Sequence, residues 1–136
     1  MKRQRLSQVF TDEKQVSATP NDFFGKLFEA RDYLHLAHLR ITGEGSFAGH
    51  KALNEAYDGL LELADGIVEA YQGVHGLMEI KVPQVIADNE PVEYLQNLSA
   101  YIEINREQFA ESWMQNEIDE VQKLIASTLY KLKYLK

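Results

Sequence analysis

The most informative pattern in the chain lies at residues 38–73, HLRITGEGSFAGHKALNEAYDGLLELADGIVEAYQG. We interpret it as the end of one helix, a tight loop at residues 43–46 and a long second helix from about Phe47 to Gln72, closed by Gly73. Apolar residues at helical spacing define the core side of this second helix: Leu53, Leu60, Ala64, Ile67 and Tyr71. A polar sector about 120° wide lies beside them and carries His50, Asn54, Asp58, Glu62, Asp65 and Glu69.

Four potential metal ligands in this region follow one another at intervals of 12, 15 and 4 residues: His38, His50, Asp65 and Glu69. Imidazole and carboxylate groups together suit Fe(II), Mn or Zn. A helix rises about 1.5 Å per residue, so His50 and Asp65 on one helix lie roughly 22 Å apart and cannot bind one ion. An antiparallel second copy would bring His50 of one chain beside the carboxylates of the other. The spacing thus predicts a metal site shared across a two-fold dimer interface.

His38 can join this site because the first helix turns back through the short loop, which brings the two imidazoles to a similar height. The two-fold axis would pass near residues 57–61, the midpoint of the spacing. Tyr57 and Leu61 border the polar sector there, and we expect them to pack against the second copy. Asp58 and Glu62 are expected to act as auxiliary carboxylates.

The pattern H-x11-H-x14-D-x3-E resembles the ferroxidase signature of the Dps-like (mini-ferritin) branch of the ferritin-like superfamily. The resemblance covers residues 24–73 and includes Phe47, three positions before the second histidine. It implies a hollow dodecameric shell that oxidises and stores iron, with the four ligands as its catalytic set. Asn54 stands where that family has an aspartate ligand, which implies one firmly held metal and a weak second position. The short chain and its YQGVHG segment are also similar to small bacteriophage ferritin-like proteins.

The composition limits the class of protein. The 136 residues are enough for one domain with its own core. Cysteine is absent, which excludes disulfides and thiolate metal sites. Neither a transmembrane span nor a signal peptide is recognisable, so we expect a cytoplasmic or virion-associated protein without membrane contacts. Residues 44–120 carry 16 acidic and 3 basic residues, a balance that attracts cations and repels a phosphate backbone.

The rest of the chain completes an all-α, ferritin-like four-helix bundle at residues 19–136, behind an N-terminal arm at residues 1–18. Thr19 and Pro20 open the first helix. Residues 73–90 form one long crossover, extended or in short helices, between helices two and three. Helix three is expected to run from Pro91 to Trp113, with Asn116 and Asp119 as a cap pair opening helix four.

Two classes of function remain open. The first is a Dps-like iron-oxidising and storage protein, a ferroxidase. The second is a phage structural or accessory protein on a ferritin-like fold, with metal optional. DNA condensation is a third reading, because Lys2, Arg3 and Arg5 of the arm could contact DNA weakly, as basic tails do in some Dps-like proteins. The chain has no Glu-x-x-His motif, which argues against a di-iron centre inside the bundle.

Overall fold

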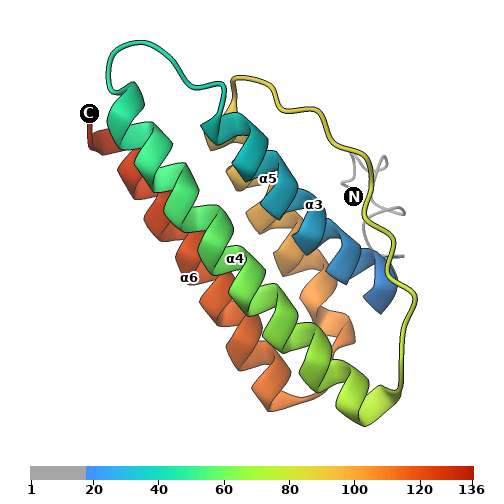
Figure 1. Cartoon of the computed structure of the whole chain (residues 1–136). Helices are drawn as coiled ribbons and strands as arrows, with labels where there is room; N and C mark the ends of the chain where they lie inside the picture. Colours follow the sequence, from blue (N-terminus) through green and yellow to red (C-terminus); the bar gives the residue numbers. More distant parts are fainter. Residues whose placement is uncertain (1–17) are drawn as a thin grey trace, which may run out of the picture.

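The computed structural model describes residues 18–136, so the predicted N-terminal arm lies, except for its last residue, outside the described residues. The described part of the chain contains four long helices and no strand (Figure 1). The prediction of an all-α, four-helix architecture is therefore confirmed. The elements are α3 (Pro20–His38), α4 (Ser46–His75), α5 (Pro91–Asn105), the 3-10 turn η1 (Arg106–Gln108) and α6 (Ser112–Tyr134).

Helix α3 begins at the predicted cap. The Asp22 backbone N–H donates to the Thr19 hydroxyl at 3.2 Å, and the Thr19 backbone N–H donates to the Asp22 carboxylate at 3.1 Å. This reciprocal pair satisfies two backbone donors that the first turn leaves without helical partners. Pro20 occupies the first helical position, where its missing N–H costs nothing.

Helix α4 is longer than predicted and ends at His75, with Gly76 as its C-cap. The prediction that Gly73 ends the helix is wrong. Gly76 has a φ of 94°, a conformation that suits glycine, and its N–H bonds to the Gln72 carbonyl at 2.9 Å. The Gln72 side chain then accepts the N–H of Met78, which fixes the direction in which the chain leaves the helix. None of the helices in residues 18–136 has the length and apolar character needed to cross a bilayer.

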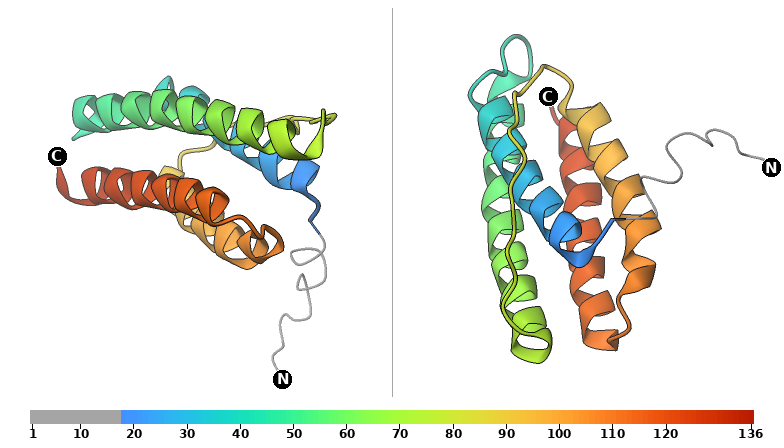
Figure 2. Two further views of the ribbon diagram at one scale, coloured as in Figure 1. Left: turned by 90° about the horizontal axis from the view of Figure 1, so that it is seen from below. Right: turned by 90° about the vertical axis from the view of Figure 1, so that its right-hand side faces the viewer.

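Residues 76–90, here called the strap, lie extended along α3 (Figures 1 and 2). Three successive contacts hold the strap there. The Asn21 amide donates to the Glu79 carbonyl at 2.6 Å, the Lys81 carbonyl lies against Gly25, and the Tyr33 hydroxyl donates to Asp88. The extended alternative predicted for this connection is therefore the one observed.

The four helices form two antiparallel hairpins, α3 with α4 and α5 with α6 (Figure 1). The strap joins them, so that α4 and α5 run in the same direction (Figure 1). The hairpins meet mainly through α4 against α6, with a smaller contact between α3 and α5. The largest side chains that are fully buried between the helices are Phe23, Phe24, Leu27, Tyr33, Leu34, Leu53, Leu60, Ile67, Leu95, Leu98, Ile102 and Met114.

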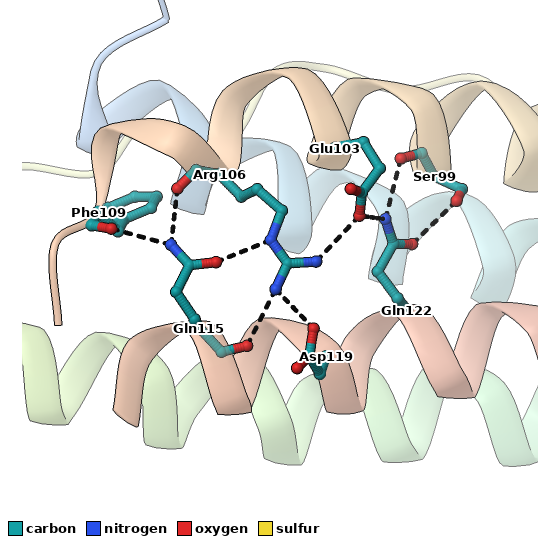
Figure 3. A network of polar contacts seen from close by, with 7 residues as sticks. All are labelled: Ser99, Glu103, Arg106, Phe109, Gln115, Asp119 and Gln122. Atoms are coloured by element: carbon teal, nitrogen blue, oxygen red, sulfur yellow. Dashed lines mark hydrogen bonds and ion pairs between the residues drawn. The ribbon is translucent and has the colours of Figure 1, made fainter. Parts of the chain in front are cut away.

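The turn between α5 and α6 differs from the prediction. Helix α5 ends at Asn105 instead of continuing to Trp113, and α6 begins at Ser112, so Asn116 and Asp119 lie inside α6 and cap nothing. The cause is a polar network across the turn (Figure 3). The Gln115 amide donates to the carbonyls of Arg106 and Phe109 at 2.8 and 2.9 Å. Satisfying these two carbonyls from a side chain stabilises a turn where helical bonds would otherwise continue.

The Arg106 side chain takes part in the same network as a donor. Its guanidinium donates to the Gln115 side-chain and backbone oxygens at 2.8 and 3.1 Å, to Asp119 at 2.5 Å and to Glu103 at 2.9 Å. Gln122, one turn further along α6, donates to Glu103 and exchanges hydrogen bonds with Ser99 (Figure 3). Polar side chains therefore connect α5 to α6 along one side of this hairpin.

Replacing Gly25 by alanine is expected to destabilise the protein. Alanine favours a helix by about 1 kcal/mol over glycine, but its Cβ would collide with the Lys81 backbone carbonyl, and such overpacking costs about 1–3 kcal/mol. Gly66→Ala is the matched control, because Gly66 lies in the interior of α4 with no atom within 4 Å of the added Cβ. Urea denaturation should therefore give opposite signs, and a stabilised Gly25→Ala variant would contradict the tight contact between strap and helix.

Replacing Arg106 by methionine keeps the aliphatic stem but removes the four hydrogen bonds that its guanidinium donates to Gln115, Asp119 and Glu103. We expect the free energy of unfolding to fall by about 1–3 kcal/mol, chiefly through the lost hydrogen bonds to Gln115. The ion pairs with Glu103 and Asp119 contribute little, because both carboxylates are largely exposed. Glu107→Ala in the same turn is exposed and should change stability by less than about 0.5 kcal/mol. Equal effects of the two substitutions, measured by urea denaturation, would show that the network does not fix the turn.

Candidate metal site

His38 and His50 come together as the sequence predicted. His38 is the last residue of α3, and His50 lies in the second turn of α4. The loop at residues 39–45 is short enough to place their rings 3.8 Å apart between centroids, with 24° between the ring planes. The predicted imidazole pair is therefore present within one chain.

Each ring of this pair has its Nδ1 atom against a backbone carbonyl. His50 Nδ1 lies 2.9 Å from the His38 carbonyl oxygen, and His38 Nδ1 lies 3.3 Å from the His35 carbonyl oxygen. A carbonyl can only accept, so in the neutral form of each ring Nδ1 carries the proton and Nε2 has a free lone pair. Metal-binding histidines are commonly oriented in this way, with one ring N–H donated to a carbonyl and the other nitrogen open to the ion.

The two rings differ in their exposure to water. His38 is only 7% exposed, whereas His50 is exposed. Burial, reinforced by the neighbouring His50, lowers the pKa of His38 below its usual value of 6.5. His38 is thus neutral near pH 7, which is the protonation state that metal coordination requires.

Tyr57 packs inside the chain instead of standing at an open interface, so its predicted role in dimer packing is not supported. Its side chain is 8% exposed and its ring stacks on His35 with 4.2 Å between the ring centroids. The His38 ring stands nearly perpendicular to it, with 5.2 Å between the centroids. The Arg31 guanidinium lies 5.5 Å from the same ring. Sequence reasoning missed this packing, although His35 lies one helical turn before His38 on the same helix. Tyr57 therefore packs against His35 and against one member of the imidazole pair, His38.

Asn54 uses its amide within the chain. Its carbonyl oxygen accepts from the Tyr57 hydroxyl at 3.0 Å, and its amino group donates to Asp58 at 3.1 Å. These bonds fix the orientation of the amide. One lone pair of the carbonyl oxygen is already used, so Asn54 is a weaker ligand candidate than its position suggested.

The carboxylates of the polar sector lie on the exposed side of α4, namely Asp58, Glu62, Asp65 and Glu69. Within residues 18–136 of a single chain, no three His, Asp or Glu side chains come together in a way that could hold a metal ion. His50 and Asp65 are separated by about four helical turns of α4. One chain therefore supplies the imidazoles at one end of the exposed face of α4 and the predicted carboxylate ligands towards the other end.

Residues 38–132 match the model of DUF5856, a family of unknown function. The chain belongs to this family. No curated protein and no solved structure matches the chain. The matched region begins at His38 and contains every residue proposed here as a ligand, while it leaves out nearly all of α3.

The low pKa of His38 has a consequence for stability. Below about pH 6.5 the unfolded chain binds a proton at this residue, whereas the folded chain resists protonation. The contribution of His38 to the free energy of unfolding is therefore expected to decrease as the pH falls through and below 6.5. Titration of the ring resonances by NMR should place the pKa of His38 below 6.5, and His50→Ala should raise it. A pKa at or above 6.5 in the parent protein would contradict the burial described here.

Proposed function

We propose that this protein is a Dps-like iron-binding protein that oxidises and stores Fe(II) at a metal site shared between two chains. In this proposal His38 and His50 of one chain bind the ion together with the partner's Asp65 and Glu69. The observation that carries the proposal is the imidazole pair, whose two Nδ1 atoms are held by backbone carbonyls. One of the two rings is buried and the other exposed, and within residues 18–136 no Asp or Glu side chain joins them as a third ligand. Two imidazoles with free Nε2 atoms therefore suit an ion whose remaining ligands come from a second chain.

The exposed face of α4 supports an antiparallel partner. In an isologous two-fold interface the residues of one helix meet those of the other in reverse order. The midpoint between His50 and Glu69 falls between residues 59 and 60, and that between His50 and Asp65 between residues 57 and 58. An axis near these positions forms two equivalent sites, one at each end of the helix pair.

Charge supports the same reading. Asp58 and Glu62 lie between the proposed ligands on the exposed face of α4, and neither forms an ion pair with a basic side chain in residues 18–136. A row of carboxylates without neutralising partners raises the local concentration of cations. We infer that these two residues attract Fe(II) towards the site and provide oxygen ligands where a ferric mineral can begin to form.

The ligand set fits oxidation of iron as a substrate. Two imidazoles and two carboxylates leave positions on Fe(II) for dioxygen or peroxide. With peroxide, two Fe(II) ions give up one electron each, and the peroxide takes up two protons and becomes two waters. Because the Asn54 amide is already bonded to Tyr57 and Asp58, we expect a second iron beside the first to bind weakly.

A mixing experiment tests whether the site is shared. A His38→Ala/His50→Ala variant and an Asp65→Ala/Glu69→Ala variant should each lose tight Fe(II) binding, measured by anaerobic dialysis with iron analysis. Unfolding the two variants together and refolding them yields mixed dimers with one intact site. We expect recovery of roughly a quarter of the parent's iron binding, since half of the randomly paired dimers are mixed and each has one of two sites restored.

Three outcomes distinguish the alternatives. Recovery on mixing supports the shared site, and no recovery with both variants folded shows that the ligands do not come from two chains. Circular dichroism and gel filtration of each variant give the necessary check on folding and dimerisation. If the parent binds Fe(II) but does not convert it to Fe(III) with either oxygen or peroxide, the proposed metal binding is supported and the proposed ferroxidase activity is contradicted.

A further inference from the structure

A hollow of about 300 Å³ lies where the strap meets α5, and Ala37 of α3 forms part of its wall. Three stretches that are distant in sequence meet around it, namely residues 37–42, residues 88–92 and Leu132. The loop after α3 contributes Ile41 and Thr42, the end of the strap Asp88 and Asn89, the start of α5 Pro91 and Val92, and α6 contributes Leu132.

The lining of this hollow combines an apolar floor with one fixed charge. Ile41, Pro91, Val92 and Leu132 supply apolar surface, and the polar groups are those of Thr42, Asp88 and Asn89. A small concave site with apolar walls and few polar groups is the usual form of a ligand pocket, and its volume is at the lower end of the usual range.

Asp88 is held firmly at the edge of the hollow. One carboxylate oxygen, Oδ1, accepts from the Tyr33 hydroxyl and from the Glu90 backbone N–H at 2.9 Å. Tyr33 is itself buried and stacked on Tyr94 at 3.7 Å, so the carboxylate is anchored to the core. The Tyr33 hydroxyl, followed by the Glu90 N–H, lowers the pKa of Asp88 below its usual value, and the group stays ionised near neutral pH.

The second oxygen of this carboxylate, Oδ2, accepts no hydrogen bond within residues 18–136. Both hydrogen bonds of the Asp88 side chain within residues 18–136 use Oδ1, which leaves Oδ2 with lone pairs for another donor. A charged acceptor discriminates strongly in favour of a cationic donor. Arg40 also acts on Asp88 electrostatically, but Arg40 does not line the hollow.

We propose that this hollow is a binding site for a small apolar molecule carrying a single ammonium group, with the ammonium on Asp88 and the apolar body against Leu132 and Val92. The site does not depend on the proposed iron chemistry. It requires the strap to be docked, because Asp88 belongs to the strap while its anchor, Tyr33, belongs to α3.

Benzylamine and benzyl alcohol are suitable probes, because they have nearly the same size and shape and differ in charge. Titration of the full-length protein, followed by ¹H–¹⁵N NMR, should give saturable shifts at residues 41–42, 88–90, 92 and 132. We expect benzylamine to bind roughly tenfold more tightly than benzyl alcohol, as one charge-assisted hydrogen bond predicts. Shifts confined to other parts of the chain would overturn the proposal.

Asp88→Asn tests the role of the Asp88 carboxylate, and Glu90→Gln is its matched control. The asparagine can still accept the Tyr33 and Glu90 donors, so the preference for benzylamine should disappear while the fold is kept. Glu90 carries the same charge two residues away but does not line the hollow, so Glu90→Gln should retain the preference. Loss of the preference in both variants would show that general negative charge, and not this site, attracts the amine.

Leu132→Phe tests the floor independently of charge, because a larger side chain occupies the space that the ring of either probe needs. Binding of benzylamine and of benzyl alcohol should weaken together in this variant. If the variant is folded by circular dichroism and binds both probes as the parent does, the hollow is not their site. Should Leu132→Phe fail to fold, the two variants at residues 88 and 90 still decide the proposal.

Discussion

The hydrogen bond between the His50 ring and the His38 carbonyl, 2.9 Å long, is the constraint around which the candidate site is built. The last carbonyls of a helix have no partner within it. Here the carbonyl of the final residue of α3 receives a donor from α4, so one bond completes a helix end, closes the hairpin and sets the tautomer of His50. A replacement at residue 50 therefore acts on the α3–α4 junction as well as on metal binding.

The two hairpins are stabilised in different ways. Aromatic and aliphatic side chains of all four helices fill the shared core, and α3 additionally holds the strap at Asn21, Gly25 and Tyr33. Along the α5–α6 hairpin the connection includes a continuous set of side-chain hydrogen bonds from Phe109 to Ser99 (Figure 3). The polar network leaves α4 untouched, so the face that carries the candidate ligands is independent of it.

Sequence reasoning succeeded where the determinants are local. Thr19 and Asp22 form a cap from four consecutive residues, and the helical period of α4 identified its buried side. It failed at residues 105–116, because the end of α5 depends on Gln115 reaching back across the turn. The imidazole pair could be predicted because only a short loop separates the two helix ends that carry it. The burial of Tyr57 could not, because it depends on how α3 packs against α4. The carboxylate half of the site stays a prediction, because Asp65 and Glu69 would meet the imidazoles only in a second copy of the chain.

The strap has a consequence for the order in which the chain folds. Each helical hairpin contains contacts between neighbouring segments, and such local contacts form quickly because little chain entropy is lost in closing a short loop. The strap makes no helix of its own and is held by α3, so its docking adds structure only after the first hairpin exists. This connectivity favours an order in which the two hairpins form first. The strap then docks on α3, and the two hairpins associate. Residues 76–90 would then be among the last segments to gain protection from hydrogen exchange during refolding.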